Sequence, residues 1–191
     1  MSSSPIGPLR RHRLTVDEYH RMAEVGILGP ETRIELIDGQ IIDMPPPGSL
    51  HAGTVAHTAR LFERAAGDAA VVWTQNPLML DEHSEPQPDI ALLRPRADYY
   101  RSRHPQPGDV LLAVEVADSS LRYDRRIKMP LYARRGIVES WIVDVQAQRI
   151  TQYREPRDDG YAYARVLKRL DAVEVVALRD LRLDLRPIFA E

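Results

Sequence analysis

The spacing of hydrophobic residues along the chain predicts three helices. The first opens at Thr15, because Thr15 and Glu18 have the spacing of a capping box, and it ends in a segment rich in glycine and proline. The third follows capping residues at 118–120 and runs to about Arg135. A second helix is expected over residues 49–66, with four apolar side chains available for one face: Leu50, Val55, Ala59 and Phe62.

Short apolar runs between these helices are typical of β-strands. Residues 110–117 are almost all apolar, as expected for an interior strand that is covered on both faces. A further strand at 137–145 follows the third helix, so the two strands should be parallel and joined by a crossover. The pattern predicts an α/β domain with a central mixed β-sheet, helices on both faces and additional antiparallel strands near the C-terminal side. Other expected strands lie at 71–80, 88–93, 149–153, 161–167 and 173–178.

Composition indicates one globular domain. The 191 residues are 43% hydrophobic, and a chain of this length can bury a core without disulfides or a structural metal. We expect a flexible leader over residues 1–13 and a single domain over residues 14–191. The chain has no cysteine, which excludes disulfides, thiolate metal sites and a cysteine nucleophile.

Charge and hydropathy restrict the partners that this protein can have. No segment approaches the roughly 18 consecutive apolar residues of a membrane span, so we expect a cytoplasmic protein without a membrane partner. The formal net charge is −2, which argues against coating DNA by bulk electrostatic attraction. Any contact with nucleic acid should therefore come from local basic patches.

Three carboxylates lie in or beside apolar segments, and they are the candidates for chemistry. Glu35 lies in residues 32–37, which the pattern places in the first helical layer, Asp89 follows a proline, and Glu115 lies inside the apolar run of residues 110–117. A buried carboxylate must find a partner, take up a proton or bind a cation. Oxygen ligands without cysteine favour Mg²⁺ or Mn²⁺ over zinc. The alternative is that each carboxylate pairs separately with an arginine.

One ordered set of residues suggests a family. Pro88-Asp89 is followed by Glu115 in a strand and by Lys128 on the next helix, with Tyr132 one turn later. This arrangement resembles the PD-(D/E)XK nuclease superfamily and, within it, the Uma2 family of restriction-type endonucleases (domain of unknown function 820). The resemblance implies a restriction-endonuclease-like core and a Mg²⁺-dependent endonuclease that acts on DNA. Its most specific segments are residues 35–41, 88–90, 114–120, 124–128 and 136–144.

The resemblance also implies roles for four catalytic residues. Asp89 and Glu115, with the carbonyl of Val116, would hold one or two Mg²⁺ ions, for which Mn²⁺ could substitute. Glu35 would add a metal ligand directly or through water. Lys128 would position the attacking water or stabilise the transition state.

The lysine departs from the superfamily pattern. The superfamily lysine normally lies two residues after the strand glutamate, where this chain has Ala117. Lys128 on the following helix is the nearest candidate, and it is one of only two lysines in the chain. The alternative is a solvated helix lysine paired with Asp124 four residues earlier.

Several other residues are candidates for supporting roles. Asp124, Tyr132 and His51 are candidates to orient the catalytic groups. The alternatives are that Asp124 faces DNA and that His51 packs on the helix surface or at its cap, and Ser119 and Ser120 are explained by helix capping. Two basic segments could contact phosphate, although a solvated loop and a charged helix face explain the same residues. Their candidate DNA-binding residues are Arg94, Arg96, Tyr99, Tyr100, Arg101 and Arg103 in the first segment and Arg125 and Arg126 in the second.

Two other classes of function stay open. A non-catalytic module for nucleic-acid binding or assembly could keep this fold, and a metal-dependent hydrolase could act on RNA or small nucleotides instead of DNA. A homodimer is expected for a nuclease that cuts both strands of a duplex, since a two-fold enzyme suits a two-fold substrate.

Overall fold

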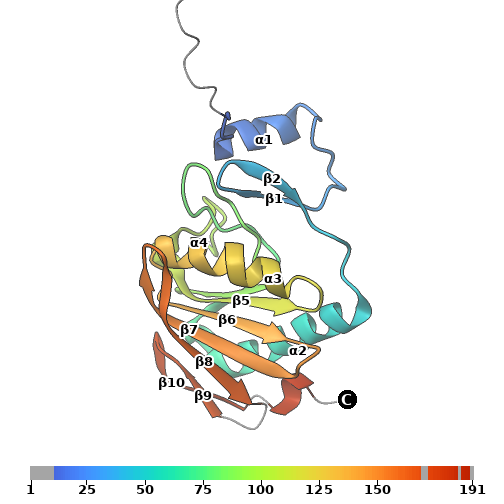
Figure 1. The fold of residues 1–191 in the computed structure, drawn as a ribbon. Coiled ribbons are helices and arrows are strands. Elements are labelled where there is room, and N and C mark those ends of the chain that lie inside the picture. The colour runs from blue at the N-terminus through green and yellow to red at the C-terminus, as the bar shows by residue number, and fades with distance from the viewer. Residues whose placement is uncertain (1–10, 169–171, 185, 190–191) are drawn as a thin grey trace, which may run out of the picture.

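A six-stranded mixed sheet forms the centre of the protein. The structure is a computed structural model, and it describes residues 11–168, 172–184 and 186–189 (Figure 1). Strands β5 and β6 are parallel, and each other neighbouring pair is antiparallel, which confirms the predicted mixed sheet. The strands in spatial order are β3 (Val71–Thr74), β4 (Ile90–Leu93), β5 (Val110–Ala117), β6 (Glu139–Asp144), β7 (Arg149–Arg157) and β8 (Gly160–Lys168).

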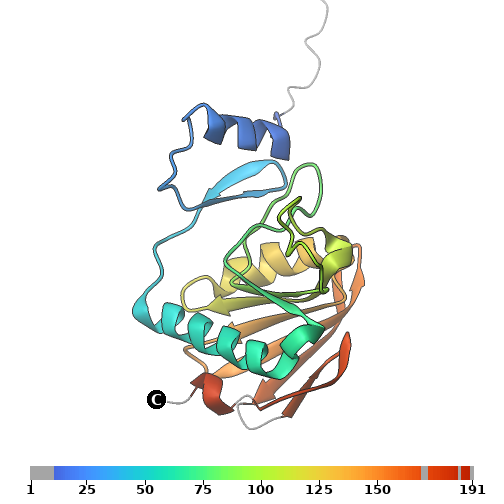
Figure 2. The same ribbon diagram turned by 180° about the vertical axis from the view of Figure 1, so that it is seen from behind.

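Helix α2 (Ser49–Ala66) covers one face of the sheet (Figure 2). Its residues Val55 and Phe62 join a buried cluster that includes Val114 of β5 and Trp141 of β6. The helix has the predicted bounds, but one predicted contact is wrong. Leu50 is 52% exposed because it lies in the first turn, beyond the part of the helix that packs on the sheet.

A second helical segment covers the opposite face. It consists of α3 (Leu121–Tyr123), a π-helical turn η3 (Asp124–Lys128) and α4 (Met129–Arg134), and it ends at Gly136 as predicted. Successive residues of a strand point to opposite faces, so Ala113 and Ala117 face this segment while Leu112, Val114 and Val116 face α2. By the same alternation Glu115 points toward η3 and α4.

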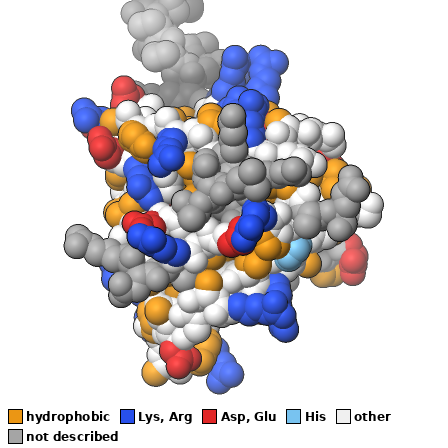
Figure 3. Space-filling model, turned by 90° about the horizontal axis from the view of Figure 1, so that it is seen from below, with side chains coloured by type: hydrophobic (Ala, Val, Ile, Leu, Met, Phe, Trp, Pro, Cys, Tyr) orange, Lys and Arg blue, Asp and Glu red, His pale blue; other side chains and the backbone are white. Residues whose placement is uncertain are grey.

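The C-terminal strands are antiparallel, as predicted. β9 (Ala172–Val175) pairs with β10 (Leu178–Asp184), and their buried residues join the core cluster on the α2 side together with η4 (Arg186–Phe189). Figure 3 views this end of the molecule, where Lys and Arg side chains are spread over the surface and several lie against Asp or Glu. No helix in the described ranges combines the length and hydropathy needed to cross a membrane.

Helix α1 (Val16–Glu24) and a hairpin of β1 (Ile34–Ile37) and β2 (Gln40–Asp43) lie at the other end of the molecule (Figure 1). The capping box of α1 is formed as predicted. Residues 32–37, in contrast, do not belong to a helical layer. Residues 34–37 form strand β1 instead, because β2 pairs along one edge of β1 and Leu36 forms a β-bridge with Glu85 along the other edge.

The turn of this hairpin explains why the strand forms. Asp38 and Gly39 both have positive φ, at 49° and 78°, which is the backbone of a two-residue hairpin turn. Arg13 packs on this turn, and its Nε donates to the carbonyl of Asp38 at 3.0 Å. Of the predicted leader, residues 1–10 lie outside the described residues, while Arg13 contacts the fold.

Candidate active site

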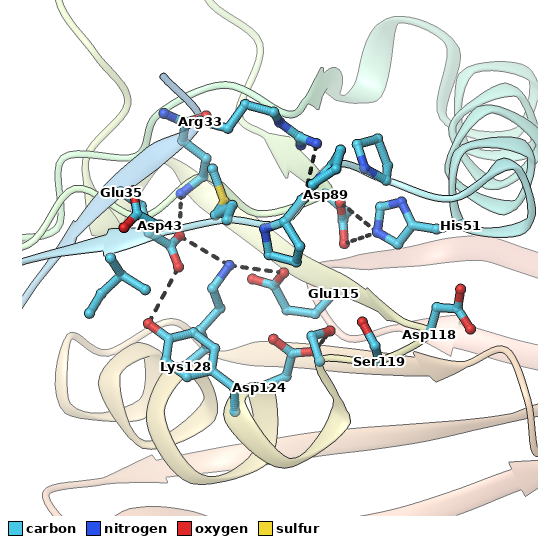
Figure 4. Close-up of a pocket in the computed structure, with 18 of the residues that line it drawn as sticks. Arg33, Glu35, Asp43, His51, Asp89, Glu115, Asp118, Ser119, Asp124 and Lys128 are labelled. Atoms are coloured by element: carbon cyan, nitrogen blue, oxygen red, sulfur yellow. Dashed lines mark hydrogen bonds and ion pairs between the residues drawn. The ribbon is translucent and has the colours of Figure 1, made fainter. Parts of the chain in front are cut away.

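A cleft of about 280 Å³ opens at the carboxyl end of β5 (Figure 4). Because β4 runs antiparallel to β5, the residue just before β4 lies at this same end. That residue is Asp89, and one of its carboxylate oxygens accepts a hydrogen bond from the amide of Val116 at 2.8 Å. The hairpin, the first turn of α2 and the α3–η3 segment form the other walls. The topology therefore gathers residues from four distant parts of the sequence.

Negative charge dominates the lining of this cleft. Besides His51, its lining includes two basic residues, Arg33 and Lys128. Clustered carboxylates repel one another, so a site of this composition favours a bound cation. The lining carboxylates are Glu35, Asp43, Asp89, Glu115, Asp118 and Asp124.

Lys128 lies between two of these carboxylates and is only 5% exposed. Its Nζ is 3.1 Å from Oε2 of Glu35 and 3.3 Å from Oε2 of Glu115. The hydroxyl of Tyr132 donates a hydrogen bond to the other oxygen of Glu115. The structure thus contradicts the alternative of a solvated lysine paired with Asp124.

The charge states in this network follow from burial and from neighbouring charges. Burial raises the pKa of Glu115 well above its usual range, although the Lys128 ammonium opposes this effect. Burial alone would lower the pKa of Lys128, but the surrounding carboxylates, Glu115 and Glu35 foremost, raise it above its usual value. Lys128 therefore holds its proton and acts as a buried positive charge.

A π-helical turn positions Lys128. The amide of Met129 donates to the carbonyl of Asp124, five residues earlier, and widens the helix at this point. Both Asp124 and Lys128 line the cleft from this turn, and Tyr132 follows on the next turn, within reach of Glu115. Such local widenings are frequent at functional sites.

Asp124 is held by a serine from the preceding turn. Ser120 donates through its hydroxyl to Oδ2 of Asp124 at 2.6 Å, and burial raises the pKa of Asp124 to about 6. The prediction that the serines act as helix caps is therefore wrong for the side chain of Ser120. Ser120 makes no side-chain cap to the backbone, because its hydroxyl is committed to the carboxylate.

Asp89 is oriented by His51, which faces the cleft from the first turn of α2. Nε2 of His51 lies 3.2 Å from both oxygens of Asp89, and the side-chain amide of Gln75 donates to Oδ1 at 3.2 Å. Burial pushes the pKa of Asp89 up, but the hydrogen bonds from His51 and Val116 outweigh it and leave the pKa below its usual value. Asp89 is therefore ionised near neutral pH. The hydrogen bond to Asp89 also raises the pKa of His51.

Glu35 is buried on β1 and reaches the cleft from the strand. The amide of Gln87 donates to Oε2 at 3.2 Å, and the hydroxyl of Tyr123 donates to Oε1 at 3.4 Å. Sequence reasoning overlooked both donors. Only their positions in the sequence could have indicated a role. Gln87 immediately precedes Pro88-Asp89, and Tyr123 lies five residues before Lys128.

The first basic segment lies away from this cleft. Residues 94–109 join the end of β4 to the start of β5, at the end of β5 opposite the cleft, and none of them lines the cleft. Tyr100 is buried there and donates to the carbonyl of Arg94. Arg96 and Arg103 flank its ring and form salt bridges with Asp98 and Asp109, while Tyr99 and Arg101 are exposed.

The second basic segment is nearer to the cleft but does not line it. Arg125 and Arg126 are exposed on η3, and Arg125 lies beside Tyr153 of β7. The cleft thus brings together every predicted catalytic residue and the three predicted supporting groups around them, but none of the arginines predicted to bind DNA.

Comparison with known proteins identifies the family and the fold. Residues 16–186 match the family described as "Uma2: Putative restriction endonuclease". The fold is similar to the crystal structure of a putative nuclease belonging to DUF820 from Anabaena variabilis ATCC 29413, with a TM-score of 0.69. That match covers 92% of this chain and 97% of the other at 18% identity, so it shows the fold alone. No curated protein matches the chain.

Proposed function

This chain belongs to the Uma2 family, and from this premise we propose that it is a metal-dependent endonuclease that hydrolyses phosphodiester bonds in DNA. One observation carries the proposal. Four residues that are distant in the sequence, Glu35, Asp89, Glu115 and Lys128, converge on one cleft at the end of β5. Carboxylates that served only as structural ion pairs would not need an accessible cavity beside them. Here three buried or nearly buried carboxylates line such a cavity.

The residues of the cleft fit a divalent cation with oxygen ligands. The lining offers six carboxylates and no thiolate, and such a donor set suits Mg²⁺ or Mn²⁺. Asp89 and Glu115, with the carbonyl of Val116, would hold the ion, and Glu35 would add a ligand directly or through water. When bound, the ion would lower the pKa of water and offset charge on the scissile phosphate.

The side chains around these ligands would hold them in place and supply charge. Tyr132 fixes Glu115, and His51 fixes Asp89, each through a hydrogen bond to a carboxylate oxygen. Lys128 keeps its proton, so it cannot accept one from an attacking water. Its ammonium would instead stabilise the negative charge that develops on the phosphate in the transition state.

A plasmid assay tests this proposal. Supercoiled DNA is incubated with the protein and Mg²⁺, Mn²⁺ or EDTA, and nicking is compared with that by Glu115→Gln. Glu63→Gln, the same change at an exposed position of α2, is the matched control. We expect metal-dependent cleavage by the wild type and the control, and loss of at least about 100-fold in Glu115→Gln.

Two results would contradict the proposal. Equal cleavage by Glu115→Gln would mean that the activity does not come from this cleft. Metal binding without cleavage of DNA would exclude the proposed substrate, and parallel incubations with RNA and with dinucleotides would then identify a different phosphodiester.

A further inference from the structure

A second cluster of potential metal ligands lies outside the cleft. His20 on α1, Glu85 between β3 and β4, and His104 between β4 and β5 each offer one ligand atom, and these atoms lie within 4.8 Å of one another. Nε2 of His20 is 2.9 and 3.1 Å from the two oxygens of Glu85. None of the three residues lines the cleft described above. The two groups of ligands are therefore separate.

The carboxylate of Glu85 is the unusual member of this cluster. Its side chain is only 3% exposed, and a buried carboxylate requires a compensating charge. Among the described residues its charged partner is His20, whose imidazole is a cation only when it carries a second proton. The exposed imidazole of His104 has no hydrogen-bond partner in the described part of the chain, yet its ring lies 6.0 Å from that of His20. A metal ion would compensate the carboxylate and employ all three side chains.

The backbone holds each of these residues in place. Helix α1 is anchored by the amide of Val16, which donates to the carbonyl of Glu82 at 2.8 Å. Glu85 is bridged to Leu36 of β1, and the carbonyl of Pro105, next to His104, accepts from Met79 at 2.9 Å. Three segments that are distant in the sequence thus present their side chains from fixed backbone.

We propose that His20, Glu85 and His104 bind a divalent transition-metal ion of the zinc class, which clamps α1 and the 94–109 loop to the body of the domain. Two imidazoles and one carboxylate are a common zinc ligand set, whereas Mg²⁺ prefers oxygen alone. Zinc bonds of about 2.0–2.2 Å place ligand atoms roughly 3.3 Å apart in a tetrahedron, so side-chain rotation would suffice to close the site. Because His104 is exposed, water would complete the coordination.

Zinc titration of the full-length, tag-free protein tests this site. Binding of Zn²⁺ is measured by calorimetry with excess Mg²⁺ present, for the wild type, for His104→Ala and for the control His57→Ala. Both histidines are exposed, so neither change should unfold the protein. We expect one equivalent at this site in the wild type and the control, and an affinity lower by at least about 10–100-fold in His104→Ala. At the same zinc concentration, zinc should also raise the Tm of the first two proteins more than that of His104→Ala.

A further variant distinguishes zinc bound at the proposed site from zinc bound in the acidic cleft. Glu115→Gln alters the cleft and leaves the three proposed ligands in place, so it should retain the zinc affinity and the Tm rise of the wild type. Absence of zinc binding by the wild type, or equal affinity in His104→Ala, would overturn the proposal. Neither result bears on DNA cleavage, which is measured separately through Glu115→Gln.

Discussion

At the scale of residues, a single buried ammonium pairs with two of the carboxylates of the cleft. Lys128 lies within 3.3 Å of both Glu35 and Glu115, and none of the three side chains is more than 6% exposed. Removing one partner of a buried ion pair strongly destabilises a protein, because the remaining charge stays buried without compensation. The residues that would bind a metal therefore also govern the stability of the metal-free protein.

Lys128→Met tests this coupling between charge and stability. The variant leaves two buried carboxylates without their cation, so we expect the free energy of unfolding in EDTA to fall by about 3–5 kcal/mol. Because a divalent cation would replace the lost charge, Mg²⁺ should raise the Tm of the variant more than that of the wild type. Thermal melts with and without Mg²⁺ measure both effects. An identical Mg²⁺ response in the two proteins would argue against a cation site beside Lys128.

His51→Ala tests the orientation of Asp89. Losing the imidazole leaves the carboxylate free to rotate, and loss of such an orienting partner typically costs about 10–100-fold in metal affinity. We expect Mg²⁺ affinity and cleavage to fall together by this factor. His57→Ala is the matched control, since it removes an exposed histidine from the same helix. If calorimetry gave one Mg²⁺ affinity for both variants, His51 would have no orienting role.

Periodicity predicted some elements well and misread others. The helix over residues 49–66 and the strand over residues 110–117 have the predicted bounds, because long apolar patterns depend little on their surroundings. Residues 32–37 have no such pattern. All four residues of β1 are buried because both faces of the strand are covered: Ile34 and Leu36 pack against α1, and Glu35 contacts Lys128 on the other face.

Gly39→Ala tests the hairpin that carries Glu35. The glycine has a φ of 78°, and an added Cβ would lie 2.6 Å from Cβ of Arg13, so we expect a loss of about 1–3 kcal/mol in the free energy of unfolding. Gly53→Ala is the control, because Gly53 lies inside α2 with nothing near its missing Cβ. That change should stabilise the helix by up to about 1 kcal/mol. Urea unfolding that shows equal stability for the two variants would contradict this account of the turn.

At the scale of the whole molecule, the candidate active-site cleft of each chain lies at the carboxyl end of β5. Under the proposed function, cutting both strands of a duplex requires two such clefts, so we predict a homodimer when DNA is bound. Analytical ultracentrifugation with a short duplex and EDTA should give a protein mass twice that of one chain. A complex with a single chain at saturating DNA would contradict this prediction and would favour nicking of one strand.

The sequence alone determined the mixed α/β architecture, the family and the identity of the acidic residues, because these depend on local patterns and on residue type. The tertiary structure decided how those residues meet. The antiparallel pairing of β4 with β5 brings Asp89 to Val116, and the π-helical turn brings Lys128 between Glu35 and Glu115. It also separated the 94–109 loop from the cleft, since strand direction, rather than distance along the chain, fixes which ends of the sheet lie together.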